Sequence, residues 1–508
     1  MMKKSALFLT LVMLVIGIIG GSTGAEGAAA AKPARDDVVI HVEAPWNTID
    51  PHGTGAYVDQ YLINQLYELL VDVKDDGSVA PSLATSWTIS PDGLTYVFAL
   101  KKGVKFHNGE EMKASDVVFS FTRAKSIPQM YDYTSMIDSV TATGDYEVKI
   151  VLKAPFAPFL SYVSKVFILN EKFVTENKGE INKIACGTGP YMLDSIEMNT
   201  VATMKAFPGY HKGEAAIKKA TFRIIIDTTT SIMAFKAGEI DFFYPSAAQY
   251  LEMKKSGQFN TGAMATLHTA LIHLNNKVAP FDNKLVRQAL NYATDKETMI
   301  LISFEGLAVP ARLLASEVAF GVDYKYAKDY PYDLQKAKAL LAEAGYPNGL
   351  SLGTMYAIAG GYHEKIAQIF HSSCAQIGVK FDILPMESST LIEMMSKGNF
   401  AFGNMGQSFG NDFAYNSRHY TTASIGSNNF DQYSNPRVDE LFTLAQSETD
   451  PEKRKAYYNE AVSIITDDAV NIPIQHKELL FAWVKGLHVV PHADSSKPYY
   501  VYEWYWER

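Results

Sequence analysis

Apolar and polar residues alternate in several short stretches of the first half of the chain. The alternation is clearest in Tyr96–Leu100 and Glu147–Leu152, where it predicts half-buried β-strands. Between these two strands, Ser115 or Asp116 is suited to cap a helix over Val117–Arg123. Other segments are typical of strands as well: Val38–Val42, Phe222–Ile226, Ile240–Tyr244, Leu271–Leu274 and Lys380–Leu384.

Helical spacing is clearer in the second half of the chain. Asp333 is suited to cap a helix with one apolar face, and Gly345 is suited to end it. Asn435 with Pro436 and Asp450 with Pro451 predict the starts of two more helices. Their expected inward residues are Val438, Leu441, Phe442 and Ala445 in the first, and Tyr457, Ala461, Ile464 and Ile465 in the second. Strands interleaved with helices indicate an α/β fold class.

The N-terminus has the order of a secretory signal peptide. A basic start is followed by the apolar run Ala6–Gly20 and then by small residues up to Ala31. The alternative, a membrane anchor, needs an apolar run of about 20 residues, and this one is shorter. We therefore expect residues 1–30 to be a signal peptide, with cleavage after Ala25, Ala28 or Ala30. Because no cysteine lies near this zone, a lipid anchor is not expected, and the mature protein is expected to be periplasmic.

Composition narrows the function classes. The 508 residues include 46 Lys+Arg and 55 Asp+Glu, a formal net charge of −9, so nucleic acid is not an expected partner. The only cysteines, Cys186 and Cys374, are expected to be two buried free thiols, although a bridge between them is the alternative. The scattered histidines form no metal-binding motif, and nucleotide-binding loops are missing, so no metal and no cofactor is predicted.

One motif is typical of enzymes. Gly406-Gln-Ser-Phe-Gly410 matches the GxSxG pattern of a nucleophile elbow around Ser408. That elbow needs a helix directly after it, whereas the residues that follow Gly410 are typical of a loop. The prediction is therefore that the protein is not an enzyme, and a secreted serine hydrolase that uses Ser408 is kept as a remote alternative.

Several motifs, in order along the chain, resemble one family. They are Pro81-Ser-Leu-Ala-Thr-Ser-Trp87, Ser90-Pro-Asp-Gly93, Lys102-Gly-Val-Lys-Phe-His-Asn-Gly109, Ala114-Ser-Asp-Val117, Gly187-Thr-Gly-Pro-Tyr191, Ala237-Gly-Glu-Ile-Asp241, Val286-Arg-Gln-Ala-Leu-Asn-Tyr-Ala293 and Tyr433-Ser-Asn-Pro-Arg-Val-Asp439. Together they resemble a family 5 extracellular solute-binding protein, the peptide, nickel or opine type that serves ABC importers. The residues themselves explain most motifs as scaffold: Gly187 to Pro190 is expected to form a tight backbone path, and Arg287 to bind a carboxylate or carbonyls.

The resemblance implies a two-lobed periplasmic binding protein fold of type II (cluster C-like), with an extra subdomain in the N-terminal lobe. Lobe I would comprise residues 31–272, including a subdomain at about 75–165. Lobe II would comprise residues 273–478, and residues 479–508 would return to lobe I with a strand at Val501–Trp506. The expected hinges are Leu274–Asn276 and Ile474–Lys477.

The resemblance also implies which loops line the cleft between the lobes. They are the loop after the first strand, a subdomain loop at Tyr131–Tyr133, and two lobe II loops at 356–363 and 404–419. The candidate ligand-binding residues are Trp46, Thr54, Gly55, Tyr57, Tyr131, Tyr133, Tyr356, Gln407, Ser408, Phe409, Asp412 and Arg418.

Two departures from the family pattern concern the ligand. Peptide binders of this family place Gly-Trp-x-x-Asp where this chain has Gly406 to Gly410, so the acid that holds a peptide ammonium is replaced by Gly410. Asp412 either substitutes for it or is a turn residue. The arginine for the terminal carboxylate of a dipeptide is also missing, and Arg418 and Arg312 are possible replacements.

The function that the resemblance implies is that of the substrate-binding component of an ABC importer. It would capture an oligopeptide or related solute and deliver it, as a monomer, to inner-membrane permease subunits. The alternative is the same fold binding a non-peptide ligand, such as an opine, an oligosaccharide or a metal chelate, for import or for sensing.

Overall fold

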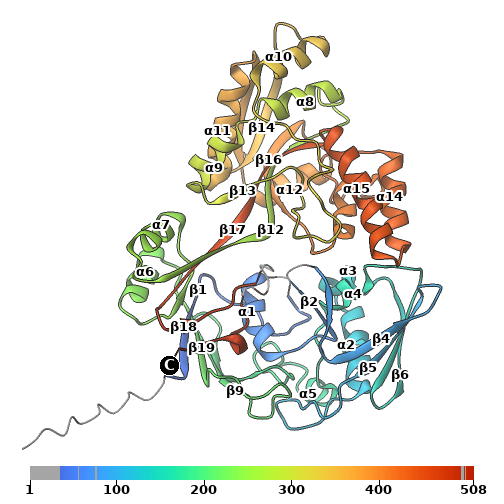
Figure 1. Cartoon of the computed structure of the whole chain (residues 1–508), viewed down its shortest axis with the longest axis vertical. Helices are drawn as coiled ribbons and strands as arrows, with labels where there is room; N and C mark the ends of the chain where they lie inside the picture. The colour runs from blue at the N-terminus through green and yellow to red at the C-terminus, as the bar shows by residue number, and fades with distance from the viewer. Residues whose placement is uncertain (1–34, 55, 75–76, 493–496, 498, 508) are drawn as a thin grey trace, which may run out of the picture. The chain divides into compact units, whose positions relative to one another are not determined.

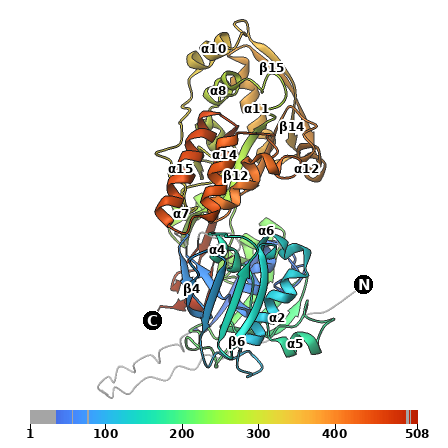
Figure 2. The same ribbon diagram turned by 90° about the vertical axis from the view of Figure 1, so that its right-hand side faces the viewer.

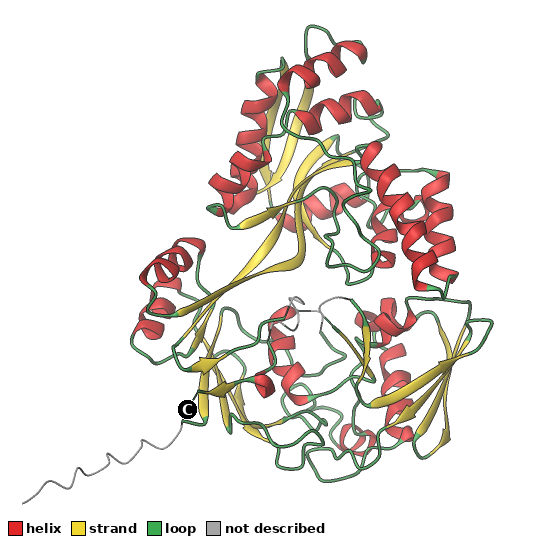
Figure 3. Cartoon of the chain, in the orientation of Figure 1, coloured by secondary structure: helices red, strands yellow, loops and turns green. Residues whose placement is uncertain are grey.

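The structure is a computed structural model that describes residues 35–54, 56–74, 77–492, 497 and 499–507. The predicted signal peptide and Gly55 lie outside the described residues. Helices and strands are interleaved along the described chain, as an α/β fold requires (Figure 3).

One mixed sheet holds eleven strands of the described chain, in the order β15-β14-β16-β12-β17-β11-β1-β10-β9-β8, with β13 beside β17. The strands are β1 Asp37–Val42, β8 Tyr191–Glu197, β9 Val201–Ala206, β10 Lys219–Ile224, β11 Phe242–Phe243, β12 Asn260–Leu274, β13 Ala308–Pro310, β14 Leu350–Ile358, β15 Val379–Met386, β16 Phe402–Ser408 and β17 Asn471–Trp483.

The long antiparallel pair β12 and β17 joins the two halves of this sheet (Figure 1). Pairing runs from Asn260 opposite Trp483 to His273 opposite Asn471, and the ladder is irregular between Ala265 and Thr269. The hinge expected at Ile474–Lys477 reaches this irregularity. The hinge expected at Leu274–Asn276 lies beyond it, at the end of β12, where the side chain of Asn275 donates to the carbonyls of Gly398 and Phe400. The bulge before Thr269 is where the register of the pair is already broken.

A separate antiparallel sheet, β4-β5-β7-β6, lies within the range expected for the extra subdomain (Figure 2). Its strands are β4 Ala84–Ile89, β5 Thr95–Leu100, β6 Ile137–Gly144 and β7 Glu147–Leu152, and β2 Val71–Val73 pairs with β3 Val79–Pro81 nearby in sequence. The helix packed against it, α2, begins at Ala114 and ends at Lys125, so it is longer than the predicted Val117–Arg123. Asp116 is not the cap: it lies inside the helix, and its carboxylate accepts the backbone N–H of Lys113 at 2.9 Å.

The remaining helices are α1 Tyr57–Leu66, α3 Tyr131–Thr134, α4 Phe159–Val163, α5 Glu171–Glu176, α6 Thr228–Lys236, α7 Ala247–Ser256, α8 Lys284–Tyr292, α9 Lys296–Phe304, α10 Leu334–Glu343, α11 Gly361–Ala375, α12 Ser388–Ser396, α13 Ser417–Tyr420, α14 Pro436–Ser447 and α15 Pro451–Asp467. The predicted caps Asp333, Asn435 and Asp450 are confirmed, since each side chain accepts backbone N–H groups of the first turn. The apolar residues predicted to point inward from α14 are all buried.

The C-terminal segment differs from the predicted strand Val501–Trp506. It forms a 3₁₀ turn over Val501–Glu503 and then only the short strand β19, Tyr505–Trp506, which pairs with β18, Leu487–His488. The reason is a side chain from α1: Gln65 accepts the N–H of Val501 at 3.0 Å, in the place of a sheet partner. Val501 and Trp504 are fully buried in the core around β1.

Both cysteines are free and buried, as predicted. They belong to different cores, Cys186 to the one beside the four-stranded sheet and Cys374 to the one beneath α11. Burial raises the pKa of the Cys186 thiol to about 11. Arg287 also behaves as predicted, because its guanidinium donates to the carbonyls of Phe281 and Asp468.

Candidate ligand-binding site

The carboxyl ends of three parallel strands meet at one edge of the large sheet. Strand β1 is parallel to both β10 and β11, with Val42 opposite Ile224 and Ile40 opposite Phe242. In open α/β sheets this edge is where ligands bind. The residues that follow these strands, Glu43 after β1 and Tyr244 after β11, are therefore candidates for a binding surface.

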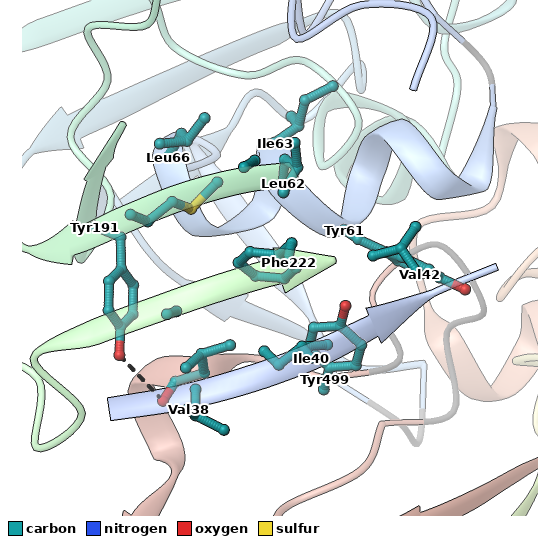
Figure 4. Close-up of a cluster of buried hydrophobic side chains, with 14 of the residues drawn as sticks. Val38, Ile40, Val42, Tyr61, Leu62, Ile63, Leu66, Tyr191, Phe222 and Tyr499 are labelled. Carbon is teal, nitrogen blue, oxygen red and sulfur yellow. Dashed lines mark hydrogen bonds between the residues drawn. The ribbon is translucent and has the colours of Figure 1, made fainter. Parts of the chain in front are cut away.

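Four tyrosines gather at this edge from three separate parts of the chain. The ring of Tyr61 in α1 is stacked on Tyr244, with 5.8 Å between the centroids, and lies 5.5 Å from Tyr499. Tyr57, one helical turn earlier, meets Tyr61 edge-on at 5.9 Å. Figure 4 shows Tyr61 and Tyr499 beside the last residues of β1. The cluster places several hydroxyl groups around the residue that follows Val42.

That residue is Glu43, and its two carboxylate oxygens have different surroundings. Oε1 accepts a hydrogen bond from the hydroxyl of Tyr61 at 3.1 Å. Oε2 is fully buried, and no hydrogen bond of regular geometry reaches it from the described residues. Burial raises the pKa of the Glu43 carboxyl, although the hydroxyls of Tyr61 and Tyr57 and the charge of Lys477 oppose part of this effect. Burial and the neighbouring Glu43 together raise the pKa of Tyr57 to about 12.

A cavity of about 780 Å³ lies on the other side of α1. Its apolar wall includes Leu69, Met130 and Phe167, and its charged lining contains four lysines against two acidic residues: Lys74, Lys165, Lys212, Lys497, Asp72 and Glu503. Lys497 is paired with Asp72 at 3.0 Å. Lys212 is paired with Glu68 at 3.0 Å, so two of the four lysines are engaged by carboxylates of the protein.

Helix α1 connects the cavity with the tyrosine cluster. Gln60 and Asn64, four residues apart, line the cavity. Tyr57 and Tyr61, also four apart, face Glu43. Because residues at i and i+4 share one stripe of a helix, the two pairs form neighbouring stripes of the same short helix.

The candidates predicted in the first loop have mixed environments. Thr54 lines the cavity, and its hydroxyl donates to Asp59 at 2.6 Å, which organises the start of α1. Tyr57 is half exposed, at 49%. Trp46 is not an open cleft residue, because it is 3% exposed and packs in the core around β1.

The two tyrosines predicted in the subdomain differ from each other. The segment Tyr131–Thr134 is a short helix, α3, and not a loop. Tyr131 is 67% exposed, whereas Tyr133 lines the cavity and meets Tyr162 edge-on. Between them, Asp132 lies 3.5 Å from the guanidinium of Arg418. The structure thus brings together Asp132 and Arg418, which are far apart in sequence.

The two segments predicted as lobe II loops are loops only in part: the first runs from the end of β14 into the start of α11, and the second runs from the end of β16 through an irregular stretch into α13. Tyr356 belongs to β14 and packs partly buried against the small core around Leu391, and Gln407 and Ser408 end β16. Gln407 and Phe409 are buried, and only Ser408 is exposed. The strand β16 lies inside the large sheet between β14 and β12, so its residues are buried or partly buried up to Gln407. Exposure begins only at its last residue, Ser408.

The surroundings of Ser408 differ from a nucleophile elbow. The chain continues from Ser408 as an irregular segment up to a 3₁₀ turn at Phe413–Asn416, and not into a helix. The imidazole of His268 lies 3.4 Å from Ser408 Oγ, and its other nitrogen lies 3.4 Å from the hydroxyl of Tyr362. Among the hydrogen bonds of the described residues, the second partner of His268 is thus the phenol of Tyr362. A catalytic triad has a carboxylate in this place.

Asp412 is a turn residue, the second of the two roles considered for it. It is 5% exposed and forms an ion pair with Arg454 of α15. Its Oδ1 accepts the N–H of Ala414 at 2.9 Å and lies 3.4 Å from the hydroxyl of Tyr458. These contacts direct its carboxylate toward α15 and pair its charge with a cation of the protein.

The arginine candidates are also engaged within the protein. Arg418 donates to the hydroxyl of Tyr415 at 2.9 Å and to Asn428 Oδ1 at 2.7 Å, and its side chain is half buried. Arg312 pairs with Asp329 at 3.1 Å. Arg418 remains the better candidate, because the hydroxyl and amide that hold it are neutral and its nearest carboxylate, Asp132, is exposed.

Sequence reasoning missed the residues that define the sheet edge. Glu43 carried a signal, because an ionisable residue directly follows an apolar strand. Tyr244 and Tyr499 carried none, since only the pairing of β1 with β11 and the return of the C-terminal segment bring them to Glu43.

The described residues contain neither a metal-binding cluster nor a membrane-spanning helix. No group of three or more histidine, cysteine, aspartate or glutamate side chains there is arranged to hold a metal ion. None of the helices in those same ranges combines the length and apolarity of a membrane span.

Comparison with known proteins places these features in a family. Residues 78–429 match the model of the bacterial extracellular solute-binding proteins, family 5. The glutathione-binding protein GsiB of Pectobacterium atrosepticum is 31% identical over 498 residues, which cover 94% of this chain and 96% of that protein. The heme-binding protein A of Haemophilus influenzae is 29% identical, with 94% of both chains covered.

Solved structures agree with this assignment. HbpA2 from Haemophilus parasuis has a TM-score of 0.85 at 28% identity, with 93% of this chain and 100% of that chain covered. The ABC transporter-associated periplasmic binding protein DppA from Helicobacter pylori, in complex with the peptide STSA, has a TM-score of 0.75 at 25% identity, with coverages of 94% and 99%. The two-lobed periplasmic binding protein fold is therefore shown, and the chain belongs to the family 5 bacterial extracellular solute-binding proteins.

Proposed function

We propose that this protein is the periplasmic substrate-binding component of an ABC importer and that its ligand is a short peptide or a peptide-like compound such as glutathione. The observation that carries the proposal is similarity over nearly the whole chain to binding proteins of this kind, among them a glutathione-binding protein and a structure with a bound peptide.

The described site supports a zwitterionic ligand. The cavity beside α1 has apolar walls and a lining that includes four lysines, and the sheet edge on the other side of α1 presents Glu43 among tyrosines. A site with aromatic walls and a few placed polar groups gains affinity by removing the ligand from water. No bond of the ligand is made or broken in this function.

Binding is proposed to shift the protein toward a closed form that docks on the inner-membrane permease. The long pair β12 and β17 suits such a motion, because its ladder is already irregular between Ala265 and Thr269. The protein is proposed to act as a monomer, with the permease as its partner.

The proposal is tested by identifying what the native protein carries. The full chain is produced with its own leader, purified without denaturation, and treated with acid, and the released compounds are identified by mass spectrometry. A control sample stripped in denaturant and refolded gives the background. Peptides or glutathione support the proposal. A non-peptide compound as the sole ligand would replace the peptide reading, and a tetrapyrrole is the specific alternative because of the similarity to a heme-binding protein.

A further inference from the structure

The small four-stranded sheet and helix α14 belong to different hydrophobic cores, yet they are bonded to each other. Phe159, which follows the loop after β7, is buried in the core of the small sheet, whereas Phe442 of α14 lies in the core around Tyr458. The N–H of Ala157, in the same loop, donates to the carbonyl of Gln446 at 2.6 Å. Two parts of the chain that are far apart in sequence are therefore joined here, in addition to the crossing strands β12 and β17.

This hydrogen bond caps the C-terminal end of α14. The helix ends at Ser447, so the carbonyl of Gln446 lies in the last turn, where carbonyls have no partner within the helix. The N–H of Asp450, four residues further on, donates to the side chain of Glu448 instead. The loop after β7 thus supplies a donor that the helix itself lacks, at the end that carries partial negative charge.

The loop is built to present this donor. Residues 155–158 begin and end with proline, which fixes φ and carries no N–H. The N–H of Phe159 donates back to the carbonyl of Phe156 at 3.0 Å, and the ring of Phe156 meets that of Tyr162 edge-on at 4.9 Å. The loop is therefore held to its own core on both sides of Ala157, whose N–H is directed to α14.

An ion pair joins the same two parts at a second point. Helix α3 packs on the core of the small sheet and α13 on that of α14. Asp132 of α3 lies 3.5 Å from the guanidinium of Arg418 of α13, which is oriented by Tyr415 and Asn428. Because the side chain of Asp132 is 64% exposed, this pair is expected to be weak and to be screened by salt.

We propose that the Ala157–Gln446 hydrogen bond and the Asp132–Arg418 ion pair form a latch through which the extra subdomain holds the cleft closed. Two bodies that share a hinge can separate only when their other contacts break, so both contacts enter the free energy of opening. Ala157 and Asp132 are positioning residues in this role, because they touch α14 and α13 and not the ligand. The role rests on the proposed function, in which the ligand shifts an equilibrium between open and closed forms.

The test measures the distance between the two parts. Spin labels are attached at Thr88→Cys in β4 and Lys453→Cys in α15, two exposed positions, while the native thiols are buried. Double electron–electron resonance then gives the distribution of distances. All samples are first stripped of bound compounds, as in the control described above, so the identity of the ligand does not enter.

The variants separate the donor from the loop. Ala157→Pro removes the N–H, and proline is favoured at the second position of a turn such as the one that the Phe159 N–H closes on Phe156. Ala157→Gly keeps the N–H and is the matched control. Asp132→Asn removes the charge of the ion pair.

The expected result is a graded opening. Ala157→Pro raises the ratio of long to short distances about 2–10-fold, the usual value of a hydrogen bond, whereas Ala157→Gly behaves like the labelled parent. Asp132→Asn raises the ratio by at most about fivefold at low salt. Raising the salt to about 0.5 M NaCl opens the parent by a similar factor and leaves Asp132→Asn unchanged, because screening acts only on the charged pair.

Other results would overturn the latch. An unchanged distribution in Ala157→Pro refutes it, and so does an equal shift in Ala157→Gly, because the loop and not its N–H would then be responsible. If Ala157→Pro does not fold, a parent that does not respond to salt, or an Asp132→Asn variant that behaves like the parent, refutes it. The proposed function is decided separately by the compounds released from native protein, so the two failures are distinguishable.

Discussion

The ion pair between Asp412 and Arg454 gives the sharpest test of the site assignment. Both residues are buried, at 5% and 8% exposure, and they join the segment after β16 to helix α15. The substitution Asp412→Asn keeps the shape and can still accept the N–H of Ala414. It removes the charge that compensates Arg454, so the guanidinium is left buried and unpaired.

The expected loss follows from that geometry. Breaking a buried ion pair by neutralising one partner costs about 3–5 kcal/mol, mainly because the remaining charge is uncompensated. For a cooperative unit of 150–250 residues, each kcal/mol lowers the melting temperature by about 2–4 °C, so the transition should fall by about 6–20 °C. Arg454 also lies over the ring of Phe320, with 4.8 Å to the centroid, and that contact does not replace a carboxylate.

The assay is thermal melting followed by circular dichroism, with titration of the tripeptide Ala-Ala-Ala, and of the same compound with an acetylated amine, on the folded variant. A second variant, Asp412→Asn with Arg454→Met, removes both charges and should recover much of the lost stability. Affinity should stay within about threefold of wild type. A variant that melts like wild type but loses tenfold or more in affinity for the free amine, and not for the acetylated one, would show that Asp412 faces the ligand and would refute the reasoning.

Two further predictions concern the scaffold around the site. Glu68 is 5% exposed, and although burial raises its pKa, the hydrogen bonds and charges of His211 and Lys212 lower it overall, below the ordinary 4.5. A carboxyl group whose pKa is lower in the folded than in the unfolded state stabilises the folded state at pH values above its unfolded pKa. This stabilisation is lost as the pH falls through its folded pKa. Glu68→Gln should thus cost about 3 kcal/mol in urea unfolding at pH 7 and progressively less below pH 4.5, whereas a constant difference would contradict the pairing. Gly187→Ala should destabilise the protein by more than about 3 kcal/mol or prevent folding, because a Cβ there would lie 2.0 Å from the carbonyl oxygen of Leu66. Gly179→Ala, where the space is open, should melt like wild type, and equal melting of the two variants would refute the close-packing argument.

Local signals in the chain were enough to predict much of the scaffold. Asp333, Asn435 and Asp450 were correctly identified as caps, because a cap bonds only to backbone groups two or three residues away. The free thiols and the carbonyl-binding Arg287 were also predicted correctly. The start of α2 was wrong because Asp116 bonds backward to Lys113 from inside the helix, and residue preferences do not separate this position from a cap.

The candidate site was harder to predict because its contacts are far apart in sequence. Glu43 bonds to Tyr61, 18 residues later in the chain, but Tyr499 reaches the ring of Tyr61 only because the C-terminal segment returns to the sheet edge, where Gln65 binds Val501. From the sequence alone, Asp412 is a candidate for binding the ligand. Only the packing of α15 shows that Arg454 pairs with it.

The amino-acid sequence by itself determined the α/β class, the helix ends and the family resemblance, since each depends on short-range bonding or on ordered local motifs. Only the tertiary structure decided which acids are paired within the protein, as Asp412 is with Arg454. The reason is that the cost of a buried charge depends on the partners that the fold brings to it, and neither burial nor partners can be read from neighbours in the chain.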